Sequence, residues 1–293
     1  MTTEINYEAK NSSPGAWAGA IDTHVHFWKY DKKRDSWITD SMKVLKENYL
    51  PEQLMLTLKR NDVAGAVAVQ ADQSEVETRF LAELANTHSF IRGVVGWIDL
   101  RSSDLEKKLQ EYSQFPVIKG WRHIVQGEPD DFLLREDFQR GVAQLKDFHY
   151  TYDILVYAHQ LPAVAEFVKK FPEHKLVIDH CAKPDIKNKK IDDWKKWMEQ
   201  IALQPNVYCK LSGLLTEASW KDWSPADFYP YLDVVFKNFG TDRLMFGSDW
   251  PVMLLSGMYV QWKSLLEKYM EGFSQDDREK VFAGNAIGFY GLS

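Results

Sequence analysis

Two histidines separated by a single valine, His24 and His26, are the residues whose types and spacing best suit chemistry. Alternate side chains of a β-strand point to the same face, about 6–7 Å apart along the chain, so both imidazoles can converge on one ligand or one metal ion. A hydrogen-bonded polar pair is the structural alternative. Because buried imidazoles on an apolar strand need partners, we favour the functional interpretation.

Two later positions complete the candidate catalytic set. His180 ends the apolar segment 176–180, and Asp249 lies in the segment 245–251, where Gly247 lets the backbone bend. A histidine after a strand is often structural, and an aspartate close to a proline often caps a turn. We nevertheless expect the three histidines and Asp249 to share one site, because all four residues end apolar runs of the same kind.

Other residues are candidates for holding a substrate. Arg122 follows an apolar run, and a planar guanidinium at the mouth of a site would bind a carboxylate or other oxygens. A salt bridge to a loop acid is the alternative for Arg122. Strand alternation places Lys119 and His123 on the face opposite Arg122, unless a bulge intervenes. Further candidates for substrate contact at predicted strand ends are Gln70, Tyr157 and Trp28.

The strands and helices that must position these residues can be predicted from a repeating pattern over residues 20–293. Short apolar, β-branched runs alternate with longer amphipathic stretches, which is typical of βα units around a parallel sheet. The predicted strands begin at Ala20, Ala64, Arg92, Val117, Thr151, Lys175, Val207 and Arg243. Eight such units predict an α/β fold, a single (β/α)₈ TIM-type barrel, whose active site lies at the C-terminal strand ends. A final helix is expected over 275–290, and a flexible leader over 1–19.

The composition excludes several classes of protein. The 293 residues carry 36 lysines and arginines against 42 acids, a net charge of −6, without the basic face that nucleic-acid binding requires. No run approaches the roughly 18 apolar residues of a membrane span. Two cysteines, Cys181 and Cys209, do not make a secreted disulfide framework, so we expect a cytoplasmic protein.

The order His24-x-His26, His180 and Gly-Ser-Asp-Trp-Pro at 247–251 resembles the amidohydrolase superfamily. More closely, the chain is similar to the lactonase branch, which includes sugar-acid lactonases for L-fucono- and L-rhamnono-lactones and 2-pyrone-4,6-dicarboxylate lactonase. Supporting stretches lie at 21–28, 69–74, 119–123, 179–184 and 283–286. The resemblance implies an enzyme that opens a sugar-acid lactone, an aldonolactone, by water attack at the ring carbonyl.

Lactone opening needs a deprotonated water, a stabilised oxyanion and a proton for the leaving alcohol. Asp249 is the expected general base, and His180 is expected to orient the water or relay its proton. His24 and His26 are expected to polarise the carbonyl, as hydrogen-bond donors or through one bound Zn²⁺. Arg122 and Tyr157 are expected to hold substrate oxygens. The expected partner is a small lactone, and the sequence does not determine its ring size or stereochemistry. It also leaves assembly into a homo-oligomer open.

The resemblance also bears on metal binding. Binuclear members of the superfamily have a bridging carboxylated lysine after strand four and a ligand histidine that ends strand five. Here Tyr157 takes the place of that histidine. We therefore expect either no required cofactor, as in lactonase-branch members that need no metal, or a single Zn²⁺ held by His24, His26 and Asp249.

Two alternatives remain at this stage. A metal-dependent decarboxylase of the same superfamily would use the same strand ends, but it would need a metal and typically a further histidine after strand five. A non-catalytic barrel that binds a sugar acid would be expected to have lost its base, whereas Asp249 and the three histidines are all present.

Overall fold

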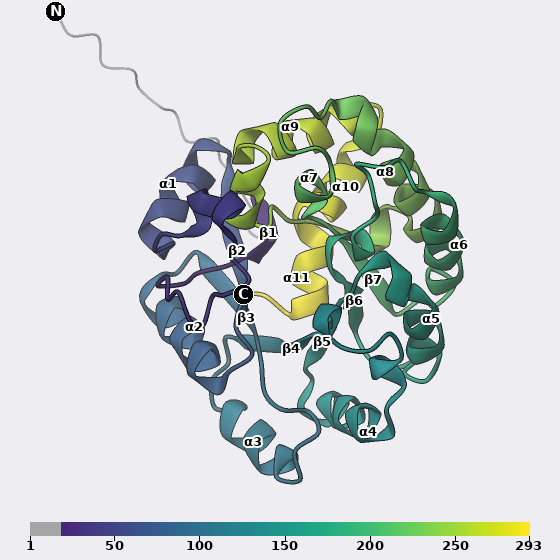
Figure 1. Cartoon of the computed structure of the whole chain (residues 1–293). Coiled ribbons are helices and arrows are strands. Elements are labelled where there is room, and N and C mark those ends of the chain that lie inside the picture. The colour runs from purple at the N-terminus through teal and green to yellow at the C-terminus, as the bar shows by residue number, and fades with distance from the viewer. Residues whose placement is uncertain (1–18) are drawn as a thin grey trace, which may run out of the picture.

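The computed structural model describes residues 19–293, so the leader expected at 1–19 lies, apart from Gly19, outside the described residues. Eight parallel strands form one sheet in chain order. They are β1 (Ala20–Val25), β2 (Val63–Val69), β3 (Ile91–Gly96), β4 (Ile118–Ile124), β5 (Thr151–Leu155), β6 (Leu176–Ile178), β7 (Val207–Leu211) and β8 (Leu244–Phe246). A parallel bridge between Val25 and Trp250 joins the chain after β8 to β1. The predicted (β/α)₈ barrel is confirmed (Figure 1).

Helices surround the sheet, apart from α11, which lies at the centre of the view against one end of the barrel (Figure 1). They are α1 (Pro51–Arg60), α2 (Glu75–Thr87), α3 (Leu105–Tyr112), α4 (Glu136–Gln144), α5 (Leu161–Lys169), α6 (Asp192–Ile201), α7 (Leu214–Glu217), α8 (Pro225–Phe239), α9 (Tyr259–Tyr269), α10 (Gln275–Glu279) and α11 (Asn285–Tyr290). The segment expected as one final helix is helical throughout, with a π-helical turn at Lys280–Gly284 between α10 and α11. Within residues 19–293, no helix is both long and apolar enough to cross a membrane.

Local sequence signals account for these boundaries. Each observed strand begins within one residue of its predicted start, because apolar β-branched runs favour a buried parallel strand. Prolines stand at the first position of α1 and α8, where the missing N–H costs nothing. The Ser74 hydroxyl accepts the Glu77 N–H at 3.2 Å and caps α2.

The barrel interior is apolar at one end and polar at the other. Inside the strands an apolar cluster packs against the C-terminal segment; it includes Ile21, Val67, Val95, Val177, Met245, Phe289, Tyr290 and Leu292. Lys175 Nζ donates to the Phe289 carbonyl at 2.9 Å and so ties the start of β6 to α11. The C-terminal segment therefore closes the N-terminal end of the barrel, and the opposite end is left for polar residues.

A bulge in β4 corrects one prediction. Val94 pairs with Ile118 but Val95 pairs with Gly120, so β4 carries one extra residue at Lys119. A Cβ on Gly93 of β3 would lie 3.0 Å from Lys119 Cγ and 3.1 Å from Leu292 of the inner cluster. Lys119 thus lies on the inner side of the barrel, as Arg122 does, and the prediction that the two face opposite ways was wrong. Lys119 nevertheless stays at the closed end, where Nζ donates to the Gly291 carbonyl at 3.0 Å.

Candidate active site

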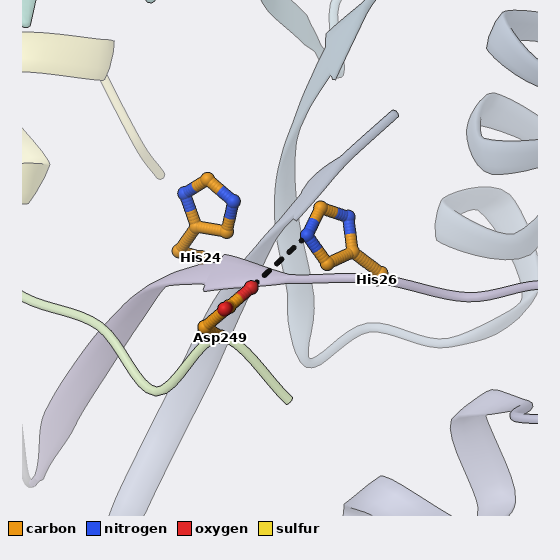
Figure 2. A group of neighbouring side chains, drawn as sticks. All are labelled: His24, His26 and Asp249. Carbon is orange, nitrogen blue, oxygen red and sulfur yellow. Dashed lines mark ion pairs between the residues drawn. The ribbon is translucent and has the colours of Figure 1, made fainter. Parts of the chain in front are cut away.

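The four predicted catalytic side chains meet at the polar end of the barrel, and all four are buried. Asp249 Oδ1 lies 3.3 Å from His26 Nε2 and 4.0 Å from His180 Nε2. The ring centroid of His24 is 4.9 Å from that of His26 and 4.3 Å from that of His180. Figure 2 shows the Asp249 carboxylate directed toward His26, with His24 beside the pair. The chain thus gathers one carboxylate and three imidazoles in a space protected from water.

The backbone around Asp249 holds its carboxylate in this position. Asp249 has a left-handed φ of 64°, and its N–H donates to the His24 carbonyl at 2.9 Å. A left-handed aspartate is uncommon and persists where surrounding structure holds it. The hydrogen bond ties the chain after β8 to the end of β1, so the base and the histidine pair are fixed to each other.

The charges of Asp249 and His180 at neutral pH follow from their surroundings. Burial alone would raise the pKa of Asp249, but the neighbouring His180 and the contact with His26 outweigh it and hold the pKa below its ordinary value. Burial lowers the pKa of His180 to about 4, despite the opposing charges of Asp249 and Asp179. Asp249 is therefore an ionised carboxylate that faces a neutral His180.

His26 lies between the Val69 carbonyl and the Asp249 carboxylate. Its Nδ1 lies 2.7 Å from the Val69 carbonyl oxygen, which can only accept, so Nδ1 carries a proton. Its Nε2 then faces the ionised Asp249 across 3.3 Å. A proton or a metal ion between Nε2 and the carboxylate would satisfy both atoms.

His180 is placed by an unusual backbone turn. Residues 180–183 all have left-handed φ values of 49–57°, although none is glycine. Ser212, at the end of β7, lies with Oγ 2.9 Å from His180 Nδ1 and directs Nε2 toward Asp249. A Cβ on Gly213 would lie only 2.4 Å from His180 Nδ1, so the ring fits against the backbone only because residue 213 is glycine.

Sequence analysis missed a buried set of charges behind His24. Asp179 Oδ2 lies 3.0 Å from Arg122 Nη1, and its Oδ1 lies 3.0 Å from Lys210 Nζ and 3.3 Å from His24 Nδ1. Lys210 Nζ also contacts Asp153 Oδ2 at 2.5 Å, where the Tyr290 hydroxyl donates at 2.8 Å. Two carboxylates are thus balanced by two cations. A lysine and an aspartate inside the apolar runs of β7 and β5 were the available signal, because such residues are rarely buried without a partner.

Three of the four predicted substrate-binding side chains donate hydrogen bonds to backbone carbonyls of the chain. Arg122 is buried; Nη1 lies 3.2 Å from His24 Nε2, and Nη2 donates to the Gln70 carbonyl. The Gln70 amide donates in return to the Arg122 carbonyl at 3.1 Å, and the Trp28 indole donates to the Glu47 carbonyl at 2.9 Å. Tyr157 is 40% exposed, and its ring centroid lies 5.7 Å from Nζ of Lys183, three residues after His180. Contact of these residues with a substrate stays a prediction.

The donor set is compatible with a metal ion, with one restriction. His24, His26 and Asp249 offer ligand atoms within 4.8 Å of one another, as do His24, Asp179 and His180. His24, however, has Arg122 Nη1 at 3.2 Å from Nε2 and Lys210 Nζ at 3.3 Å from Nδ1. An ion bound by either trio would therefore compete with a cationic side chain for a His24 nitrogen.

Comparisons with known proteins agree with this geometry. A family model described as Amidohydrolase matches residues 21–292. The L-fucono-1,5-lactonase of Burkholderia multivorans is 39% identical over 284 residues, which cover 93% of this chain and 96% of that enzyme. The crystal structure of a Burkholderia multivorans amidohydrolase with bound zinc matches with a TM-score of 0.91 and 38% identity, covering 94% of this chain and 100% of that one. A dihydroxybenzoic acid decarboxylase from Polaromonas sp. JS666 shares the fold alone, with 13% identity, a TM-score of 0.65, and coverage of 94% and 97%.

Proposed function

Because this chain belongs to the amidohydrolase family, we propose that it is a lactonase that hydrolyses a sugar-acid lactone to the open-chain acid. The observation that carries the proposal is Asp249, a buried ionised carboxylate held between His26 and His180. A carboxylate in this setting can take a proton from water. The 39% identity to a lactonase over nearly the whole chain supports the lactone as substrate class.

The proposed reaction uses water as nucleophile. Water attacks the ring carbonyl carbon and gives its proton to Asp249, which creates a tetrahedral oxyanion. His26 polarises the carbonyl as a hydrogen-bond donor and stabilises that oxyanion, and the neutral imidazole of His180 orients the water. The ring C–O bond then breaks, and the leaving oxygen takes the proton from Asp249. Each bond that forms or breaks is thus served by a group of this chain.

The remaining candidate residues have supporting roles in this proposal. His24 has both ring nitrogens engaged by Asp179, Arg122 and Lys210, so it positions its neighbours and adds its ring to the wall of the site. This wall is held in place by three buried side chains that hydrogen-bond to other residues of the chain: Arg122, Gln70 and Trp28. Tyr157 is exposed at the rim and is the one best placed to contact the substrate.

We propose that the lactonase needs no metal and holds at most one ion. A single Zn²⁺ would be held by His24, His26 and Asp249, and it would supply Lewis-acid polarisation and a water of lowered pKa. The proposal of metal independence is supported by His24, whose Nε2 lone pair receives the Arg122 N–H, and by Asp249, which is ionised and can serve as base without an ion.

The alternatives are less well supported. Decarboxylases share only the fold with this chain, at 13% identity, and the described Tyr157 stands where a further ligand would be needed. A binding protein without catalysis does not account for the intact carboxylate and imidazole cluster. The cytoplasm remains the expected compartment, since both cysteines are free and buried. Assembly into a homo-oligomer stays a prediction.

A proton-release assay tests the function. Each lactone that opens releases one proton, so a pH indicator reports hydrolysis across a panel of aldonolactones, with and without a chelator. We expect turnover of at least one aldonolactone, retained after chelation. Asp249→Asn is expected to lower kcat by roughly 10²-fold or more, whereas the exposed Asp193→Asn is the matched control and leaves kcat unchanged. Turnover of no lactone, or an Asp249→Asn kcat within about threefold of wild type, contradicts the proposal.

A further inference from the structure

A lysine and a glutamate face each other at the rim of the site without a hydrogen bond between them. Lys183 is the last residue of the left-handed turn that begins at His180, and Glu217 ends α7. Lys183 Nζ lies 3.8 Å from Glu217 Oε1, beyond the 2.7–3.2 Å of a hydrogen bond. The two side chains are only 19% and 21% exposed. Within residues 19–293, each of the two is the other's one ion-pair partner.

This pair adjoins the site, because Lys183 belongs to the same left-handed turn as His180. After burial and the two histidines, the positive charge of Lys183 is a further influence that lowers the pKa of Asp249. Burial raises the pKa of Glu217; Lys183 opposes that rise, and the charge of Asp249 adds to it. Lys183 Nζ also lies 5.7 Å from the ring centroid of Tyr157. The rim therefore brings together an ammonium, a carboxylate and an aromatic face.

The chemistry of this rim fits a ring with several hydroxyls. Partial burial of the Lys183 and Glu217 charges has a desolvation cost. A bound molecule that supplies hydrogen bonds to these two groups is therefore favoured. A hydroxyl can both donate to the carboxylate and accept from the ammonium, and the C–H surface of a sugar can pack on the tyrosine ring. A substrate carboxylate at the same position would be attracted by Lys183 but repelled by two negative charges, Glu217 and Asp249.

We propose that Lys183 and Glu217 bind the ring hydroxyls of the lactone, and that Glu217 selects neutral polyhydroxylated lactones against lactones that carry a carboxylate. This inference rests on the proposed lactonase function and adds the class of substrate to it. A salt bridge that only pins the turn at 180–183 to α7 would stabilise the fold but would not distinguish the two kinds of lactone.

Two matched substrates separate these possibilities. L-fucono-1,5-lactone is neutral, and a galactarolactone of the same ring configuration carries a carboxylate in place of the C6 methyl. We expect Glu217→Gln to raise KM for the neutral lactone about tenfold with kcat within about threefold, because the lost contact is made before and during reaction alike. The ratio of kcat/KM, neutral over anionic, should fall at least tenfold. Glu217→Asp, which keeps the charge, should restore much of that ratio.

Controls make each outcome decisive. Glu199→Gln on α6 removes a carboxylate that makes no contact with Lys183 or Glu217 in the described residues, and it should leave both substrates unaffected. Thermal unfolding checks that every variant folds. Lys183→Gln should raise KM for the neutral lactone as well. A Glu217→Gln enzyme with unchanged KM and an unchanged substrate ratio, while wild type opens the neutral lactone, overturns this inference alone. A wild-type enzyme that opens neither lactone nor any of the aldonolactone panel overturns the proposed function and this inference with it.

Discussion

Replacement of Lys210 by methionine tests whether the buried charges behind His24 are a balanced set. Lys210 Nζ lies 2.5 Å from Asp153 and 3.0 Å from Asp179, and all three side chains are fully buried. At an effective dielectric constant of about 20, a contact of about 3 Å has a gross attraction of about 5 kcal/mol, most of which offsets the cost of desolvating the ions. Removal of one partner leaves a buried charge uncompensated. We expect Lys210→Met to lower the free energy of unfolding by about 3–5 kcal/mol.

A second substitution shows that the loss comes from charge imbalance and not from a smaller side chain. Lys210→Met combined with Asp153→Asn removes one charge of each sign, so the double variant should recover about 2 kcal/mol or more of the loss. Urea unfolding at pH 7 measures both variants, and the exposed Lys195→Met is the matched control, expected within about 0.5 kcal/mol of wild type. A single variant less than about 1 kcal/mol below wild type, or a double variant no more stable than the single, refutes the argument.

Other predictions concern metal binding and pH. Arg122→Met should tighten Zn²⁺ binding, measured by calorimetry, because it frees His24 Nε2 and removes a cation 3.2 Å away; unchanged or weaker binding would contradict the assignment. Wild-type lactonase activity should persist after thorough chelation, whereas complete loss with recovery on added Zn²⁺ would favour a metal-bound nucleophile. Burial raises the pKa of Glu77 to about 7 from 4.5, so the native state holds this proton to higher pH than the unfolded chain. Its contribution to stability, about 3 kcal/mol, is therefore full below about pH 4.5 and is lost as the pH rises through 7. Glu77→Gln should flatten this dependence in urea unfolding at about pH 5 and pH 8; an unaltered slope would refute it.

Local patterns in the sequence predicted the fold and the set of residues at the site. The strand starts at Ala20 and Val207 were matched to the residue, because apolar β-branched runs of this length have few other stable environments. His24, His26, His180 and Asp249 converge because the C-terminal ends of parallel strands in a closed barrel share one end. These inferences need no knowledge of which side chains touch.

Backbone irregularities were not predictable in this way. The extra residue at Lys119 depends on how β4 aligns with β3, and a lone Gly120 signals either a bulge or an ordinary strand. The left-handed turn at 180–183 contains no glycine, and it is held by contacts from elsewhere in the chain. Among them, the Trp194 indole donates to the Cys181 carbonyl at 2.7 Å. Long-range contacts of this kind decide local conformation against the propensity of the residues themselves.

The pairing of charges, which the sequence does not reveal, decides which aspartate can act as base. Asp153 and Asp179 both lie within ion-pair distance of Lys210, and Asp179 also pairs with Arg122, so their charges are neutralised by permanent cations. Across the described residues 19–293, Asp249 is paired only with His26 and His180, whose charges depend on protons. A base must accept a proton and give it back within one turnover. Despite its burial, Asp179 has a pKa held well below its ordinary value by Lys210, His24 and Arg122. Asp153 Oδ2 is fully buried between Lys210 Nζ and the Tyr290 hydroxyl, so it is not available to water. Asp249 is thus left as the one carboxylate of the three that can exchange a proton with water.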